Sequence, residues 1–409
     1  MTCVYTAYIL TGMSSKQPIP LFDNLEHLME RPLSAGLSEY QSDFEHARQF
    51  LISYRGSQDT FSAYRRELER YLQWLWLVAQ KKLAQIKRID FENYIQFCQS
   101  PPDAWIGSKQ VPRFLSKEGL RVPNDTWRPF LQQGKGETLK KYYLSQKSLE
   151  AMMATISSFY QFMIQEEYLE GNPVALIRQK SKYFRKQQGK ATVRRLSELQ
   201  WAYVIETAQQ MAESNPAEHE RTLFIMSALF SMYLRISELA ASKRWVPVMR
   251  HFHRDSDGNW WFTTVGKGNK QRDIAVSDAM LNALKRYRSS LELSALPDLN
   301  DNYPLLPKVR GKGPIESTRR IRTIVQSCFD NAMTRLQKDG FSEEALQLEA
   351  ATVHWLRHTG ISEDVKIRPR EHVRDDAGHG SSEITDKYID IELRERHASS
   401  KNKKIDPDK

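Results

Sequence analysis

Cysteine is scarce in this chain of 409 residues. The three cysteines, Cys3, Cys98 and Cys328, lie far apart and form no CxxC pair. A disulfide framework or a structural zinc site needs closely spaced or clustered ligands. The spacing supports neither, and it fits a protein of the reducing cytoplasm.

Long apolar runs are also missing. Residues 1–16 contain an apolar stretch that no basic segment precedes, and it is shorter than the roughly 20 residues of a membrane helix. No later segment reaches that length. We therefore expect no membrane partner and interpret residues 1–39 as an N-terminal tail or arm.

Acidic residues are outnumbered by basic ones. There are 60 Lys and Arg against 50 Asp and Glu, which gives a formal net charge of +10. This balance favours a polyanionic partner such as nucleic acid. The length and a hydrophobic content of 40% predict two or more domains, each with a core of its own.

Helical periodicity begins near residue 40. One apolar stripe consists of Phe61, Tyr64, Leu68, Leu72 and Leu75, with Asp59 or Thr60 placed to cap the helix. A second consists of Leu149, Met152, Ile156, Phe159 and Met163, and Gly171 to Pro173 are expected to stop that helix. Residues 101–140, rich in Pro, Gly and Trp, are predicted to be an irregular insertion. It either packs on its own domain or extends contacts with DNA or protein.

Residues 178–195 form a basic segment without any acidic residue. Its eight cations are Arg178, Lys180, Lys182, Arg185, Lys186, Lys190, Arg194 and Arg195. A capping box, Ser197 to Gln200, follows and predicts a new helix. The segment therefore marks a domain boundary, as a solvated tether or as a tether that lies along phosphates.

The second half opens with helical patterns and then changes to strands. Between residues 245 and 277, β-branched and aromatic runs are interrupted by Asp257-Gly258 and by Gly266 to Asn269, two turn signals at hairpin spacing. Three antiparallel strands are expected there, and helices again from about residue 316. The predicted fold is mainly α with a small antiparallel β-sheet.

Several residues of this half suit phosphodiester cleavage without a metal. Such a reaction needs guanidinium forks around the phosphate, an acid for the leaving oxygen and a base for the nucleophile. Arg235 has Glu238 three residues on, which is also the spacing of a structural ion pair. Lys267 and the nearby Lys270 lie in a Gly-flanked hairpin tip, where solvated lysines are common.

Histidines and a tyrosine complete the set of candidates. His354 and Arg357 share a helix face, and His379 lies between two glycines, although each suits a structural role as well. No Cys or carboxylate stands at zinc-ligand spacing around the histidines, so no metal site is predicted. Tyr388, nine residues after His379, is either a surface aromatic residue or a nucleophile.

The ordered set of these residues resembles the tyrosine recombinase (phage integrase) family, which includes Xer, Cre and lambda-type integrases. The resemblance covers roughly residues 40–395 and rests on "LRISELA", "VGKGNKQRDIAV", "HWLRHTG" and "AGHGSSEITDKYID". The family usually has glycine where Leu234 stands.

The resemblance implies a role for each matching residue. Arg235 and Arg357 would clamp the scissile phosphate, with Glu238 steadying Arg235. Lys267 would protonate the departing 5′ oxygen, with Lys270 as a competing acid or a DNA contact. His354 would assist proton transfer and His379 would hydrogen-bond the phosphate. Tyr388 would attack and form a 3′-phosphotyrosine, with neither metal, ATP nor other cofactor.

The resemblance also implies an architecture and partners. Residues 40–177 would form a helical core-binding domain, 178–195 a basic linker, 196–395 the catalytic domain and 396–409 a C-terminal tail. The two domains would close as a C-shaped clamp on double-stranded DNA with inverted-repeat half-sites. A dimer on each site and a tetramer on paired sites, with accessory proteins, would act in the bacterial cytoplasm at the nucleoid.

The function predicted from the sequence is site-specific DNA recombination, for integration, excision or transposition of a mobile element. Two alternatives stay open. One is a type IB topoisomerase-like enzyme that shares the phosphate clamp, and the other is an inactive DNA-binding protein on the same fold.

Overall fold

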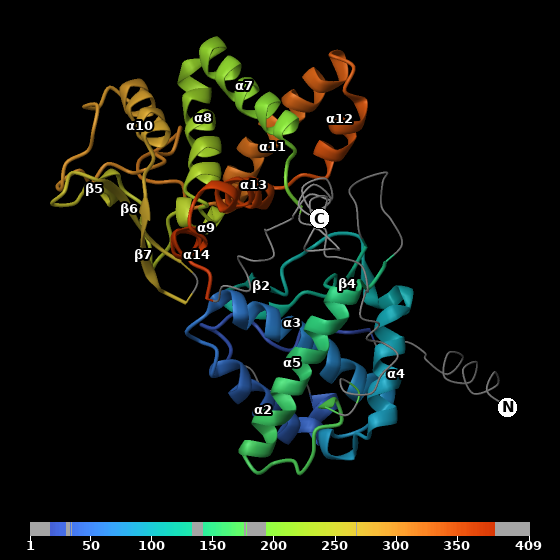
Figure 1. Ribbon diagram of the computed structural model, residues 1–409. Helices are drawn as coiled ribbons and strands as arrows, with labels where there is room; N and C mark the ends of the chain where they lie inside the picture. Colours follow the sequence, from blue (N-terminus) through green and yellow to red (C-terminus); the bar gives the residue numbers. More distant parts are fainter. Residues whose placement is uncertain are drawn as a thin grey trace, which may run out of the picture. The chain divides into compact units, whose positions relative to one another are not determined.

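The computed structural model divides the chain into two compact units, residues 1–188 and 189–409. It describes residues 17–29, 33, 35–132, 142–175, 177, 194–266 and 268–380 (Figure 1). Each unit has its own hydrophobic core.

Within its described residues, the N-terminal unit contains four α-helices, and their apolar stripes meet in one core. They are α2 (Gln41–Ile52), α3 (Gln58–Trp74), α4 (Arg88–Gln99) and α5 (Gln146–Gln165). Short helical turns are η1 (Ala35–Tyr40), η2 (Leu75–Ala79), η3 (Leu83–Gln85) and η4 (Asp103–Trp105). All residues of both predicted stripes are buried except Tyr64, which is partly buried. The hydroxyls of Tyr71 and Tyr160 are 2.6 Å apart inside this core, so each satisfies the other.

The ends of two helices differ from prediction. Helix α3 starts one residue before Asp59 and has Ser57 at its N-cap position, so the expected Asp59 or Thr60 cap is wrong. Helix α5 ends at Gln165, well before Gly171, because Glu167 takes a left-handed φ of 56°. That reversal lets the Tyr168 N–H donate to Met163 O at 2.9 Å.

The insertion contains regular structure, contrary to expectation. Strands β1 (Ile106–Gly107) and β4 (Phe130–Leu131) pair in parallel, and β2 (Phe114–Lys117) and β3 (Leu120–Pro123) form an antiparallel hairpin. The insertion packs on its own unit: Arg113 Nε donates to the buried Glu69 carboxylate at 2.9 Å, and Arg70 Nε donates to Pro129 O at 2.7 Å.

The C-terminal unit is a set of helices with one three-stranded sheet. Its α-helices are α7 (Glu198–Ser214), α8 (Pro216–Ser231), α9 (Ile236–Leu239), α10 (Asp278–Ser290), α11 (Thr318–Lys338), α12 (Ser342–Glu349), α13 (Val353–Ile367) and α14 (Arg370–Ala377). The predicted capping box starts α7, since Ser197 Oγ accepts from Gln200 N at 3.1 Å and Gln200 Oε1 accepts from Ser197 N at 2.9 Å.

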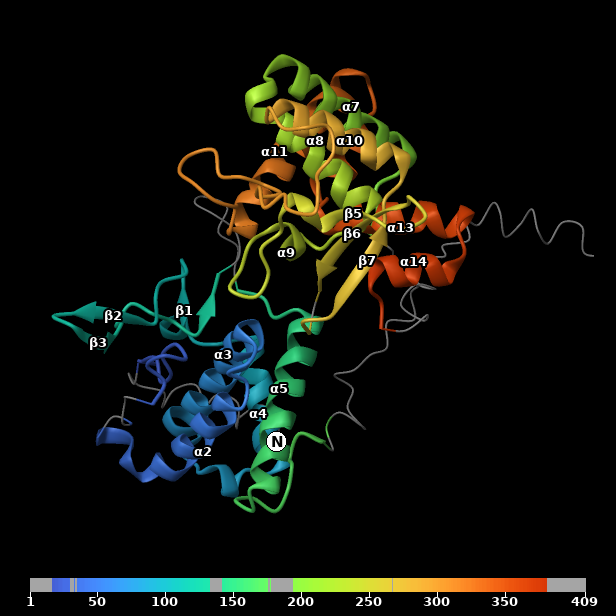
Figure 2. The ribbon, with the colours of Figure 1, turned by 90° about the vertical axis from the view of Figure 1, so that its left-hand side faces the viewer.

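The three predicted strands are present in the expected order. After a 3-10 turn, η6 (Met249–His251), strand β5 (Phe252–Arg254) pairs with β6 (Trp260–Val265), and β6 pairs with β7 (Gln271–Ala275), both antiparallel. Phe252, Phe262 and Ile274 lie opposite one another and enter the core. Helix α14 lies beside β7 in both views (Figures 1 and 2).

The fold class predicted from the sequence is therefore confirmed, because the described residues are mostly helical and carry small sheets. Among the described residues, no helix is long and apolar enough to span a membrane.

Candidate active site

Arg235 stands at the break between α8 and α9. It is the N-cap residue of α9, where its N–H donates to Glu238 Oε2 at 2.8 Å and its Nη1 donates to Glu238 Oε1 at 3.1 Å. Glu238 is fully buried, whereas the Arg235 side chain is 27% exposed. The Glu238 carboxylate thus orients the Arg235 guanidinium from the buried side and leaves the solvent-facing edge of the guanidinium accessible.

A second arginine, which the sequence reasoning missed, shares this carboxylate. Arg272 on β7 donates from Nη1 and Nη2 to the two Glu238 oxygens at 2.8 and 2.9 Å, and its Nε donates to Asp376 O at 2.9 Å. Burial alone would raise the pKa of Glu238, but the hydrogen bonds and charges of Arg272 and Arg235 outweigh it and hold that pKa below its ordinary value. The alternation of residues along the predicted strand could have indicated Arg272, because it lies two residues before Ile274 and so on the same, inward face of β7.

Glu238→Gln is expected to destabilise the unit by about 2 to 3 kcal/mol, since a buried charge is removed and Arg272 keeps only a neutral acceptor. Urea unfolding of the full chain measures this loss. Asp273→Asn, on the solvent face of the same strand, is the matched control, with an expected change within about 0.5 kcal/mol. Equal effects of the two substitutions would contradict the pairing.

The predicted second arginine is buried in the C-terminal unit. Arg357 on α13 is 3% exposed; its Nη1 donates to Tyr233 O and its Nη2 donates to Ala377 O at 2.6 Å. Three residues later, Gly360 lets α13 approach α8 closely, because a Cβ there would lie 2.0 Å from Phe230 O. The helix contact therefore fixes the depth at which Arg357 sits.

Several residues of the candidate site contact the turn that follows α14. Gly378 closes the helix with φ 63° and ψ 48°, and a Cβ there would lie 2.9 Å from Arg272 Cδ, so the position requires glycine for both reasons. Arg235 Nη2 donates to Gly378 O at 3.3 Å, and Arg357 Nη2 lies 3.1 Å from His379 Nε2. Arg235, Arg357 and His379 thus converge on one turn.

Three histidine rings share this cationic environment. The rings of His354 and His358 stack with centroids 5.7 Å apart. Burial, followed by the charges of Arg357 and Arg235, lowers the pKa of His354, and the same three causes lower that of His379 to about 4. Two guanidinium groups beside uncharged imidazoles form a site suited to an anion that also accepts hydrogen bonds, such as a phosphate ester.

The depressed pKa of His379 predicts a pH dependence of stability. Between pH 6.5 and about 4 the unfolded chain binds a proton at His379 that the folded chain does not. The free energy of unfolding therefore decreases as the pH falls through that window. NMR titration of the His379 ring, assigned with His379→Gln, should give a midpoint near 4 in the folded protein. A midpoint at or above 6.5 would contradict the described environment.

Tyr233 holds Arg357 from the other side. It is buried with a left-handed φ of 50°, its carbonyl accepts from Arg357, and its hydroxyl donates to Asp364. Arg368 Nη1 donates to the same hydroxyl at 3.0 Å, and Arg368 Nη2 donates to Asp376 at 2.6 Å. Burial and then Asp364 raise the pKa of Tyr233. The network connects both carbonyls that Arg357 contacts, because Asp376 precedes Ala377.

The conformation that favours glycine therefore occurs at Tyr233, not at Leu234. Leu234 is an ordinary residue of the hydrophobic core.

Tyr233→Phe is expected to lower the free energy of unfolding of the full chain by roughly 1.5 kcal/mol, since hydroxyl hydrogen bonds to the charged Asp364 and Arg368 are lost. Tyr287→Phe is the matched control, because Tyr287 is also buried and, within the described residues, its hydroxyl has no hydrogen-bond partner. Urea unfolding measures both variants, and equal losses would contradict the network described around Tyr233.

Some of the other predicted site residues lie outside the described residues. Lys267, Tyr388 and the basic residues Arg178, Lys180, Lys182, Arg185, Lys186 and Lys190 all do. Arg194 and Lys270 are exposed and Arg195 is partly buried. A Cβ on Gly266 would lie 3.4 Å from Arg235 Nη1, so the β6–β7 turn begins directly beside Arg235.

The described residues contain no group of three or more His, Cys, Asp or Glu side chains placed to hold a metal ion.

Known proteins with similar sequences are tyrosine recombinases. No protein-family model matches the chain. The chain is 25% identical over 304 residues to XerD from Staphylococcus saprophyticus, which covers 74% of this chain and 77% of that protein. It is 23% identical over 255 residues to XerC from Bacillus subtilis (61% and 71% covered). The match to XerD from Rickettsia conorii, 24% identical, spans only 46% of that protein.

Solved structures with a similar fold include further recombinases and integrases. The XerH site-specific recombinase bound to palindromic difH substrate, a post-cleavage complex, superposes with a TM-score of 0.54 at 13% identity over 97% of this chain and 93% of that chain. The Tn1549 transposon integrase with circular intermediate DNA gives 0.52 at 14% identity over 87% and 97%. The resemblance to tyrosine recombinases stated from the sequence is confirmed.

Proposed function

We propose that the protein is a site-specific DNA recombinase that cleaves and rejoins strands through a 3′-phosphotyrosine on Tyr388. The observation that carries the proposal is the convergence of Arg235, Arg357 and His379 on the turn at Gly378. That turn lies ten residues before Tyr388 in sequence. The similarity to tyrosine recombinases supports the same activity.

In the proposed reaction the Tyr388 hydroxyl attacks the scissile phosphorus, and the 5′ oxygen leaves with a proton from Lys267. Arg235 and Arg357 neutralise the charge that grows on the non-bridging oxygens. His379 binds one of these oxygens, and His354 assists the proton transfer from Tyr388. A 5′ hydroxyl of another strand then attacks the phosphotyrosine, so the bond energy is conserved and the step requires neither metal nor ATP.

We further propose that the two units are a core-binding domain (40–177) and a catalytic domain (196–395) that close on a half-site as a clamp. Four copies would act on two paired inverted-repeat sites, with accessory proteins, at the bacterial nucleoid. The Tn1549 integrase neighbour supports a role in moving a mobile element.

The proposed linker contact with phosphates predicts a change in salt dependence. Neutralising Lys180, Lys182, Arg185 and Lys186 together should reduce the slope of log K against log salt by roughly 3 to 4 units, because each lost phosphate contact removes about 0.9. Fluorescence anisotropy at several salt concentrations measures the slope. A variant with four exposed lysines neutralised elsewhere is the control, and an unchanged slope would make the segment a simple tether.

Mapping of covalently captured DNA tests the function. Purified protein is incubated with fragmented genomic DNA of its host in EDTA and without ATP, then denatured, and the linked strands are sequenced. Adducts clustered at one inverted repeat would support a recombinase. Adducts scattered without sequence preference would favour the topoisomerase-like alternative, and their complete absence would favour an inactive DNA-binding protein.

A further inference from the structure

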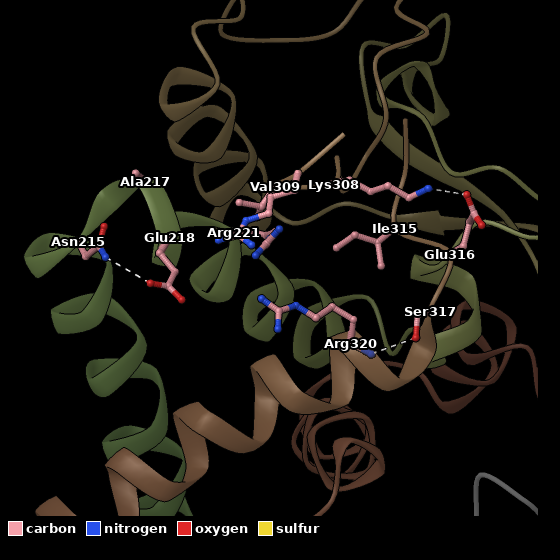
Figure 3. Close-up of a pocket in the computed structure, with 11 residues that line it drawn as sticks. Asn215, Ala217, Glu218, Arg221, Lys308, Val309, Ile315, Glu316, Ser317 and Arg320 are labelled. Carbon is pink, nitrogen blue, oxygen red and sulfur yellow. Dashed lines mark hydrogen bonds and ion pairs between the residues drawn. The ribbon is translucent and has the colours of Figure 1, made fainter. Parts of the chain in front are cut away.

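A second cationic cavity lies in the C-terminal unit, away from the turn at Gly378. It has a volume of about 780 Å³ and lies between the start of α8, the segment 308–316 and the start of α11 (Figure 3). Four of its lining residues are basic: Arg221, Lys308, Arg310 and Arg320. None of them belongs to the candidate active site.

Arg221 is a buried arginine of this cavity. It is only 8% exposed, yet it forms no ion pair within the described residues. Among the residues that the structure describes, its Nε has no hydrogen-bond partner, and its Nη1 makes a long contact of 3.5 Å with Pro307 O. A buried guanidinium is costly unless an anion accompanies it. Arg288, which is also buried in the same unit, has such a partner in Asp301 at 2.7 Å.

The two carboxylates that line the cavity interact with residues other than Arg221 and Arg320 at hydrogen-bond distance. Glu316 pairs with Lys308 at 2.7 Å, and Glu218 accepts from Asn215 Nδ2 at 3.3 Å. Arg221 and Arg320 instead point toward one another across the cavity (Figure 3). Burial is the main cause that lowers the pKa of Arg221, and the charge of Arg320 lowers it further, while Tyr287 and Glu218 act in the opposite direction.

The start of α11 adds a third source of positive potential. The helix has 21 residues, its first turn contains no acidic residue, and Ser317 Oγ accepts only from Arg320 N, at 3.3 Å. The first N–H groups of an α-helix have no partner within the helix, so those of this turn can bind a ligand. A helix N-terminus beside two arginines is a favourable position for a phosphate group.

We propose that this cavity is a second phosphate-binding site, in which Arg221, Arg320 and the first turn of α11 hold one phosphate group. Its chemistry fits a phosphodiester of DNA bound away from the cleavage point and equally a free phosphorylated molecule. The proposal does not depend on the activity proposed above.

Calorimetric titration of the full chain with pyrophosphate tests the site. Arg320→Gln is the main variant, because this exposed side chain can be changed without loss of packing, and Arg221→Gln is the second. Each should weaken pyrophosphate binding at least about tenfold, as expected for a charged hydrogen bond. Lys338→Gln, at the far end of the same helix, is the matched control and should bind as the wild type does.

DNA binding by the same variants separates the two sources of phosphate. A salt slope reduced by about 1 in Arg320→Gln, with competition between pyrophosphate and DNA, would assign the site to a DNA phosphate. An unchanged slope with pyrophosphate binding lost would assign it to a free phosphorylated molecule. Binding that is lost in Arg235→Gln but retained in Arg320→Gln and Arg221→Gln, or no binding at all together with an unchanged slope, would overturn the proposal. Adduct formation through Tyr388, measured in parallel, reports separately on the proposed function.

Discussion

Tyr388→Phe is expected to abolish covalent protein–DNA adducts while DNA affinity stays within about twofold of wild type. The phenolic oxygen is the atom that would form the bond to phosphorus, and phenylalanine has no nucleophilic oxygen in its place. Denaturing gels with end-labelled DNA detect the adduct, and anisotropy measures affinity. Activity at background level is predicted at any protein concentration.

A matched control for Tyr388→Phe is Tyr303→Phe, which removes a partly exposed phenolic hydroxyl elsewhere in the C-terminal unit. That variant should form adducts at the wild-type rate. Adducts that persist in Tyr388→Phe would move the nucleophile to another residue and would contradict the proposed mechanism.

Arg357→Ala is expected to slow cleavage by about 10²- to 10³-fold, equivalent to about 3 to 4 kcal/mol, as for the loss of a donor to a developing oxyanion. Arg357 is held in a fixed position, because two carbonyls accept hydrogen bonds from it and it lies against His379. Arg357→Lys should recover only part of the rate, since an ammonium keeps the charge but not the planar fork.

Because Arg357 is buried, its variants need a separate stability measurement. Single-turnover rates are therefore compared at a temperature where urea titration shows each variant to be folded. A rate within tenfold of wild type for folded Arg357→Ala would reject the arginine clamp.

Sequence reasoning predicted the elements whose physical signals are local. The two apolar stripes of the N-terminal unit, the capping box at Ser197 and the three strands between residues 245 and 277 follow from periodicity and turn residues. It also proposed that Glu238 steadies Arg235, since a spacing of three residues at a helix start brings the two side chains together.

Features that depend on packing between distant segments could not be predicted. Arg272 reaches Glu238 across 34 residues, and Tyr233 holds Arg357 across 124. Helix ends were also misjudged: α5 stops at Gln165 because Glu167 adopts a left-handed conformation, which the sequence favours only weakly at a glutamate. The insertion looked irregular because its strands are only two to four residues long and are stabilised by contacts with α3.

Mass spectrometry of the protein–DNA adduct would identify the residue that bonds to DNA. After cleavage of DNA containing the mapped site, the adduct is digested with nuclease and trypsin, and the peptide that carries a nucleotide is sequenced. We expect a 3′-phosphoryl nucleotide on the Tyr388 oxygen, in the peptide that follows Lys387. A nucleotide on any other residue, or a 5′ linkage at Tyr388, would contradict it.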